Sequence, residues 1–107
     1  MTASPDLLFR SLSDPTRRAI FERLCRDGEQ TVAALTAQAG VSQPVVSKHL
    51  AQLKQAGLVR DRPAGRQTHY SAQPKALGPL MDWTKTMAGF WEGRFDDLED
   101  LLKRMDQ

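Results

Sequence analysis

A run of polar side chains with helical spacing lies between residues 43 and 56. One face of the helix that this segment predicts carries Gln43, Ser47, Lys48 and Gln52. The apolar residues of the other face are Val46, Leu50 and Leu53. Glutamine can pair bidentately with adenine, lysine with guanine, and serine with several base edges. These residue types permit contact with nucleic acid, although, taken alone, the pattern is more typical of an ordinary solvated helix face.

The elements that must position these side chains are a helix, a tight turn and a second helix. Thr31 is a suitable cap for a short helix that ends before Gly40. Ser42 is a suitable cap for the next helix, of about residues 43–56, which Gly57 ends. Because a short turn containing glycine sets two helices at a steep angle, the segment predicts a helix-turn-helix.

A β-hairpin is predicted directly after this motif. Residues 58–62 and 67–71 favour β-structure, and the Pro-Ala-Gly-Arg sequence between them is typical of a turn. Arg62 and Arg66 flank the predicted tip, where a guanidinium can enter a minor groove or contact the phosphate backbone. A basic two-stranded wing after a helix-turn-helix has few explanations other than nucleic-acid binding.

Basic and acidic residues are unevenly distributed along the chain. Residues 1–75 hold 11 Lys/Arg and 6 Asp/Glu, whereas residues 76–107 hold 4 and 7. Within residues 42–75, Asp61 is accompanied by the basic residues Lys48, Lys54, Arg60, Arg62, Arg66 and Lys75. A basic block joined to an acidic segment is typical of a polyanion-binding unit with a separate assembly element. On charge alone, a chance imbalance is an equally good interpretation.

Two terminal helices are predicted, over about residues 5–12 and 76–105. The apolar stripe of the long helix includes Leu80, Met87, Trp91 and Leu98. Such a stripe needs more cover than the core of a 107-residue chain supplies, which favours partial burial in a dimer over packing on its own domain. The leucines of the short helix that complete the predicted interface are Leu7, Leu8 and Leu12.

Length and composition indicate one domain over residues 1–107. No apolar run approaches the roughly 18 residues that a membrane span requires, and the N-terminal sequence lacks the features of a secretory signal. One cysteine cannot form an internal disulfide, so we expect a reducing, cytoplasmic location. The chain lacks a phosphate-binding glycine loop and a nucleophile elbow, and we do not expect it to be an enzyme.

Three sequence blocks resemble the ArsR family of winged-helix repressors. They are LSDPTRR at residues 12–18, VSQPVVSKHL at 41–50 and AGLV at 56–59, in the order and at the spacing of that family. The resemblance implies a mainly α-helical winged helix-turn-helix fold with a small β-hairpin, dimeric through its terminal helices. It implies a sequence-specific repressor that binds an inverted-repeat operator in double-stranded DNA as a homodimer.

The resemblance also assigns roles to the predicted motif. The helix of about residues 43–56 corresponds to the one that reads the major groove, and the hairpin of about residues 58–72 corresponds to the wing. The base-side candidates are then Gln43, Ser47 and Lys48, and Ser42 is a phosphate contact.

Several other side chains admit two interpretations. His49 either contacts a phosphate or fills a half-buried slot, with the structural role slightly favoured. Arg17 and Arg18 are expected to pair with nearby acids rather than with DNA. Tyr70 is expected to face the core, because its ring buries a large apolar area.

Metal sensing, which many members of the family perform, is not expected of this chain. The helix of residues 32–39 lacks Cys, His and Asp, and the C-terminal helix lacks His. Cys25 stands alone and is expected to be a small buried hydrophobe, although single-thiol or intermolecular chemistry stays open. We therefore predict no metal site and no cofactor. Regulation is expected from a small organic effector at the dimer interface, from the protein's own level, or from Cys25.

The alternative function is that of a protein-interaction module. Its aromatic C-terminal helix would bind a partner, while the winged helix would have lost DNA binding. The basic stretch of residues 42–75 argues against this alternative.

Overall fold

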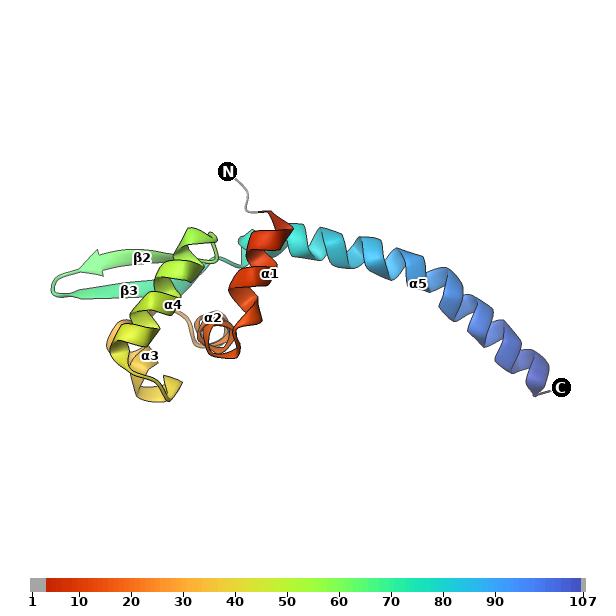
Figure 1. Cartoon of the computed structure of the whole chain (residues 1–107), viewed down its shortest axis with the longest axis horizontal. Coiled ribbons are helices and arrows are strands. Elements are labelled where there is room, and N and C mark those ends of the chain that lie inside the picture. The colour runs from red at the N-terminus through yellow and green to blue at the C-terminus, as the bar shows by residue number, and fades with distance from the viewer. Residues whose placement is uncertain (1–3, 107) are drawn as a thin grey trace.

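The computed structural model describes residues 4–106, apart from the side chain of Phe95, as helices with one small sheet (Figure 1). The helices are α1 (Pro5–Ser13), α2 (Pro15–Asp27), α3 (Val32–Ala39), α4 (Gln43–Gln55) and α5 (Gly78–Met105). The strands are β1 (Gln30–Thr31), β2 (Val59–Ala64) and β3 (Gln67–Ala72), and a 3₁₀ helix, η1 (Pro74–Leu77), precedes α5. The predicted combination of helices and a hairpin is confirmed, and residues 1–3 and 107 of the predicted domain lie outside the described residues.

Two capping residues set the starts of α2 and α3, and one glycine sets the end of α3. Asp14 Oδ1 accepts a 2.9 Å hydrogen bond from the backbone N–H of Arg17, so Asp14 caps α2. Thr31 Oγ1 accepts a 3.1 Å bond from the backbone N–H of Ala34 and caps α3. Gly40 ends α3 with φ +72°, a left-handed conformation that other residues rarely adopt. This conformation provides the tight turn of the predicted helix-turn-helix.

The sheet is antiparallel with strand order β1–β3–β2. Its hairpin turn is shorter than predicted: Pro63 and Ala64 remain in β2, which leaves Gly65 and Arg66 as a two-residue loop. Pro63 is tolerated there because β2 is an edge strand, where a missing N–H need not cost a ladder hydrogen bond. Strand β1 has only two residues and therefore no sequence pattern that predicts it.

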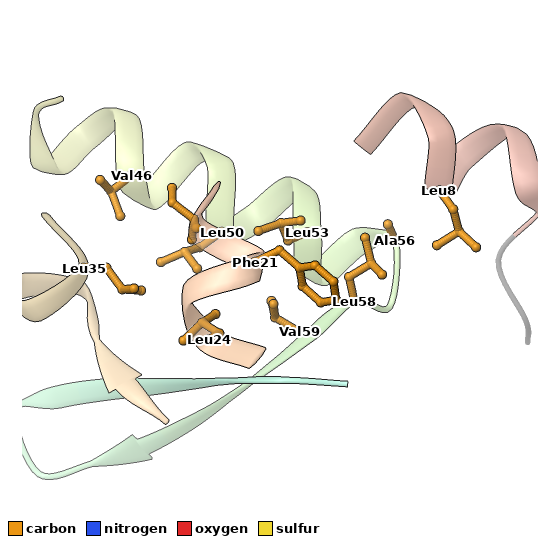
Figure 2. Close-up of a cluster of buried hydrophobic side chains, with 11 residues drawn as sticks. Leu8, Phe21, Leu24, Leu35, Val46, Leu50, Leu53, Ala56, Leu58 and Val59 are labelled. Atoms are coloured by element: carbon orange, nitrogen blue, oxygen red, sulfur yellow. The ribbon is translucent and has the colours of Figure 1, made fainter. Parts of the chain in front are cut away.

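The core lies between α1, α2, α3, α4 and the start of the hairpin. Figure 2 shows its side chains converging from these elements. Its largest fully buried side chains are Leu8, Leu24, Leu35, Val46, Leu50, Leu53 and Leu58. Tyr70 is half-buried and packs against this core, in agreement with its predicted orientation.

Two predictions about burial are wrong. Leu8 is fully buried inside its own protomer, so it cannot form part of a dimer surface. Cys25 is exposed, because the buried stripe of α2 consists of Ile20, Phe21 and Leu24 and the next residue already faces outward. Partial burial and the nearby carboxylate of Glu22 raise the pKa of the Cys25 thiol, which keeps it in the less reactive protonated form.

Helix α5 extends away from the rest of the molecule (Figure 1). The extents of the whole molecule, α5 included, are 70 × 31 × 20 Å. Near its start, Leu77 and Leu80 pack against the core, and Trp83 meets Phe9 of α1 edge to face with ring centroids 5.0 Å apart. The large exposed hydrophobic residues of α5 are Met81, Trp83, Phe90, Trp91, Leu98, Leu101, Leu102 and Met105. No helix among residues 4–106 is long and apolar enough to cross a membrane.

Candidate nucleic-acid interface

The outward face of α4 brings the predicted base-side residues together. Gln43, Ser47 and Lys48 are all exposed on this helix. Its inward residues Val46, Leu50 and Leu53 are fully buried, so the helix is held by its apolar face. The polar groups are therefore presented to solvent by a helix that cannot roll without disrupting the core.

The first turn of α4 is suited to an anion. Ser42 occupies the N-cap position, but its hydroxyl makes no cap hydrogen bond. Its carbonyl accepts a 3.1 Å bond from the N–H of Val46. The earlier N–H groups of a helix have no partner within it and lie at the positive end of the helix dipole. This geometry fits the phosphate contact predicted for Ser42.

A pocket of about 250 Å³ lies between the start of α4 and the tip of the wing. Its lining residues are Thr31, Val32, Ala33, Gln43, Arg66, Gln67 and Thr68. Arg66 is exposed, and among the described residues it has no ion-pair partner. A guanidinium with neighbouring hydroxyl and amide groups is a suitable set of donors for phosphate oxygens.

Arg62, the other wing residue predicted to contact DNA, forms an ion pair inside the protomer. Its Nη2 lies 2.6 Å from Glu29 Oε1, and its Nε donates to Glu29 Oε2 at 3.3 Å. His69, which lies opposite Arg62 in the hairpin, places Nδ1 3.7 Å from the same Oε1. Glu29 thus partly neutralises the wing, so the charge imbalance of residues 42–75 overstates the positive charge available to a polyanion.

A second basic residue of this stretch is also paired. Lys54 Nζ donates to Asp61 Oδ2 at 3.0 Å, which joins the end of α4 to β2. Because Asp61 accepts from its ammonium, Lys54 is not a simple phosphate contact.

Stability is expected to fall in acid because three of these carboxylates are ionised more readily in the folded state. Hydrogen bonds lower the pKa of Asp14 (from the Arg17 N–H), Glu29 (from Arg62) and Asp61 (from Lys54). A lowered folded-state pKa contributes stability above the unfolded pKa, and this contribution is lost as pH falls through the range below about 4. We expect the Tm at pH 3 to lie below that at pH 6.

The matched control is Asp14→Asn, which keeps the cap but removes the titrating group. The Tm of this variant should fall less between pH 6 and pH 3 than the Tm of the unaltered protein. Equal losses would show that Asp14 contributes nothing to the acid sensitivity.

His49 and Arg17 lie behind the outward face of α4. His49 is half-buried, with Nε2 3.9 Å from the Asp14 carboxylate and Nδ1 3.5 Å from the Arg17 guanidinium. The structure thus places His49 in the half-buried slot. Gln52, predicted on the outward face, instead accepts a hydrogen bond from Arg17.

The expectation that Arg17 and Arg18 pair with acids is wrong, because no hydrogen bond of either side chain among the described residues goes to a carboxylate. Arg17 donates to the backbone carbonyls of Ser11 and Arg10, and Arg18 donates to that of Leu12 at 2.9 Å. The last carbonyls of a helix have no partner within it and carry partial negative charge. The two arginines therefore cap the C-terminal end of α1.

Sequence reasoning missed Glu29 and the part played by Gln52. Glu29 is 33 residues from Arg62, and Gln52 is 35 residues from Arg17. A periodic pattern within one helix or strand carries no information on such contacts. One signal in the sequence could have indicated a polar contact inside the protomer: Gln52 is a polar residue next to the buried stripe of α4.

The helices, the wing and the exposed polar face of α4 together define a winged helix-turn-helix DNA-binding protein. A helix-turn-helix domain family matches residues 12–62. The HTH-type transcriptional regulator Rv2034 of Mycobacterium tuberculosis is 44% identical over 92 residues, covering 81% of this chain and 85% of that protein. The transcriptional repressor SdpR of Bacillus subtilis is 34% identical over 76 residues, covering 71% and 83%.

The solved structures agree with these relatives. The crystal structure of the ArsR family transcriptional regulator RHA00566 superposes with a TM-score of 0.73 and 30% identity, covering 86% of this chain and 97% of that one. The chain therefore belongs to the ArsR family of winged helix-turn-helix regulators. Its function is that of a DNA-binding transcriptional repressor, and these relatives are named as regulators rather than as enzymes.

Proposed function

We propose that the protein represses transcription by binding an inverted-repeat operator as a homodimer, with α4 of each protomer in the major groove of one half-site. The observation that carries this proposal is the exposed row of Gln43, Ser47 and Lys48 on α4, next to the pocket that Arg66 borders. The three α4 residues face the base edges, where the ammonium of Lys48 also reaches a neighbouring phosphate, while Ser42 and Arg66 hold the phosphate backbone. Arg62 and His49 contact DNA only if Arg62 gives up its ion pair with Glu29 and His49 its contact with Asp14.

The proposed dimer surface is the apolar stripe of α5 with the adjoining part of α1. Residues of this stripe predicted for the interface and found at least partly exposed are Leu7, Leu12, Leu80, Met87, Trp91 and Leu98. An open apolar hollow of about 380 Å³ at the start of α5 is lined by Leu77, Leu80, Met81, Thr84 and Lys85. A partner protomer would fill this hollow. A homodimeric winged helix-turn-helix domain from Mycobacterium bovis, 25% identical with a TM-score of 0.62, supports this assembly.

The test is selection of binding sites from a random duplex library, together with a gel shift on the DNA upstream of the protein's own gene. The proposal expects enrichment of an imperfect inverted repeat whose half-sites lie about one helical turn apart. Enrichment of no sequence, with no retarded band, would overturn it and favour the protein-interaction module.

Replacing Gln43 by alanine should blur the preference at one base position of each half-site. The amide is placed at the first residue of α4, where the side chains of a recognition helix reach base edges. Loss of a bidentate contact is expected to cost about 1–3 kcal/mol against the preferred base. Repeating the selection with Gln43→Ala measures this effect, and an unchanged base preference would remove Gln43 from readout.

Transition metals should not release the protein from DNA. Cys25, His49 and His69 lie on α2, α4 and β3, and the two imidazoles already face Asp14 and Glu29. A tight site needs several such groups around one ion at about 2.0–2.3 Å. We propose instead that regulation comes from a small organic effector at the dimer interface, from the protein's own level, or from Cys25 chemistry.

An operator titration with zinc, cadmium, copper(I), nickel and arsenite, each with a chelator control, measures the metal response. The expected result is an affinity that stays within about twofold. A loss of about tenfold or more at micromolar metal, reversed by the chelator, would mean that a ligand set forms on dimerisation.

A further inference from the structure

The guanidinium of Arg17 joins three helices. It is carried by α2, and its Nε and Nη2 donate to the carbonyls of Ser11 and Arg10 at the end of α1, the latter at 3.0 Å. Its Nη1 donates to the side-chain oxygen of Gln52 on α4 and lies 3.5 Å from Nδ1 of His49 on the same helix. The three nitrogens of one planar group therefore face four partners, two on α1 and two on α4.

The α1 side of this junction leads to the proposed dimer helix. Ser11 is buried, and Phe9, two residues earlier, packs edge to face against Trp83 of α5. The α4 side leads to the DNA-facing residues, because Gln52 follows Lys48 by one helical turn, about 6 Å along the axis. Arg17 is thus the polar link between the helix that proposed dimerisation holds and the helix that reads DNA.

We propose that Arg17 and Gln52 are positioning residues that set the orientation of α4 for base readout. The inference rests on the proposed function. Packing of Val46, Leu50 and Leu53 fixes which face of α4 is buried, and the Arg17–Gln52 bond adds a directional contact on the flank. Base-edge hydrogen bonds require placement within roughly 0.5 Å, so a small change in the tilt of α4 is felt by Gln43, Ser47 and Lys48.

Only arginine can make this junction. A lysine keeps the positive charge but has a single ammonium, which cannot face the α1 carbonyls and Gln52 in the planar fork that the guanidinium provides. Arg17→Lys therefore separates the geometry of the junction from its charge.

The experiment compares Gln52→Met, Gln52→Glu and Arg17→Lys with the control Gln55→Met. Gln55 is exposed and borders the same pocket as Arg17 and Gln52, but it does not bond the guanidinium. Binding is measured by fluorescence anisotropy on the duplex that the unaltered protein selects and on a scrambled duplex. The readout is the ratio of the two affinities, with Tm and oligomeric state recorded for each variant.

Gln52→Met and Arg17→Lys should each lower the affinity ratio by about tenfold, the scale of one hydrogen bond to a charged group. Gln55→Met should leave the ratio within about twofold, and Gln52→Glu, which keeps the acceptor, should lose less of the ratio than Gln52→Met does. The slope of log affinity against log salt should be unchanged in Gln52→Met, Arg17→Lys and Gln55→Met, because none of these three changes the net charge or removes a phosphate contact.

An unchanged affinity ratio in Gln52→Met would overturn the inference, whether both affinities stay the same or both fall equally. A loss of ratio in Gln52→Glu as large as in Gln52→Met would show a merely structural role and would also overturn it. Failure of the unaltered protein to prefer any sequence is a different outcome, because it would remove the proposed function itself.

Discussion

A glutamate in place of Leu98 is expected to convert the protein to monomers and to abolish tight operator binding at the same time. Leu98 lies on the apolar stripe of α5 and is half exposed in the protomer. In a two-fold dimer the substitution would bury two unpaired carboxylates, which costs several kcal/mol. A monomer holds a single half-site and loses the gain from bivalent binding, so operator affinity should fall about 100-fold or more.

Sedimentation velocity and operator binding on the same samples measure the two effects together. Because Leu98 lies outside the buried core, the Tm of the protomer should change little on its own account. Trp91→Glu is expected to act in the same way. The control is Thr86→Glu, which adds the same charge to α5 at an exposed position that helical spacing turns away from Leu98. An intact dimer for Leu98→Glu would place the interface elsewhere on the molecule.

The elements of this fold were predictable because their signals are local. Asp14 and Thr31 stand at helix starts, Gly40 occupies a left-handed turn, and the apolar residues of α4 repeat at helical spacing. Each feature depends on a few consecutive residues. The two-residue strand β1 has no such signal, since its strand character comes from pairing with Tyr70 and His69.

Burial of single residues was harder to predict where a helix contacts several neighbours. The sequence of the first helix shows Leu7, Leu8 and Leu12 as equivalent leucines, but Leu8 is fully buried in the core and the other two are half-buried. The error at Cys25 has the same origin, because a shift of one residue, about 100° around a helix, exchanges a buried face for an exposed one.

The site was predictable as a set of exposed polar side chains but not as a set of partners. Gln43, Ser47 and Lys48 could be placed on one face from spacing alone. The ion pair of Arg62 with Glu29 and the hydrogen bond of Arg17 with Gln52 depend on how α2, α4 and the wing pack together. Long-range contacts of this kind decide which basic residues remain available to DNA, and neither charge counts nor periodicity contain them.

Operator affinity is expected to fall about 150-fold when salt rises from about 50 mM to about 200 mM. Lys48 and Arg66 are exposed and, within the described residues, have no ion-pair partner. Two protomers then supply about four cations, and the slope of log affinity against log salt is about −0.9 per neutralised phosphate. The measurement is an anisotropy titration of the selected duplex over this salt range. An affinity that is insensitive to salt would remove the electrostatic part of the proposed binding mode.

Arginine variants of the wing test which guanidinium contacts a phosphate, because each lost phosphate contact changes the salt slope. Arg66→Ala should make the slope shallower by about 2 per dimer and weaken binding similarly on all sequences, because a phosphate contact carries no base preference. Arg62→Ala should change the slope less, since Glu29 already holds that guanidinium at 2.6 Å. Glu29→Gln should steepen the slope by releasing Arg62 to the DNA. If Arg62→Ala flattens the slope as much as Arg66→Ala does, the pair with Glu29 opens on binding, and both arginines of the wing are phosphate contacts.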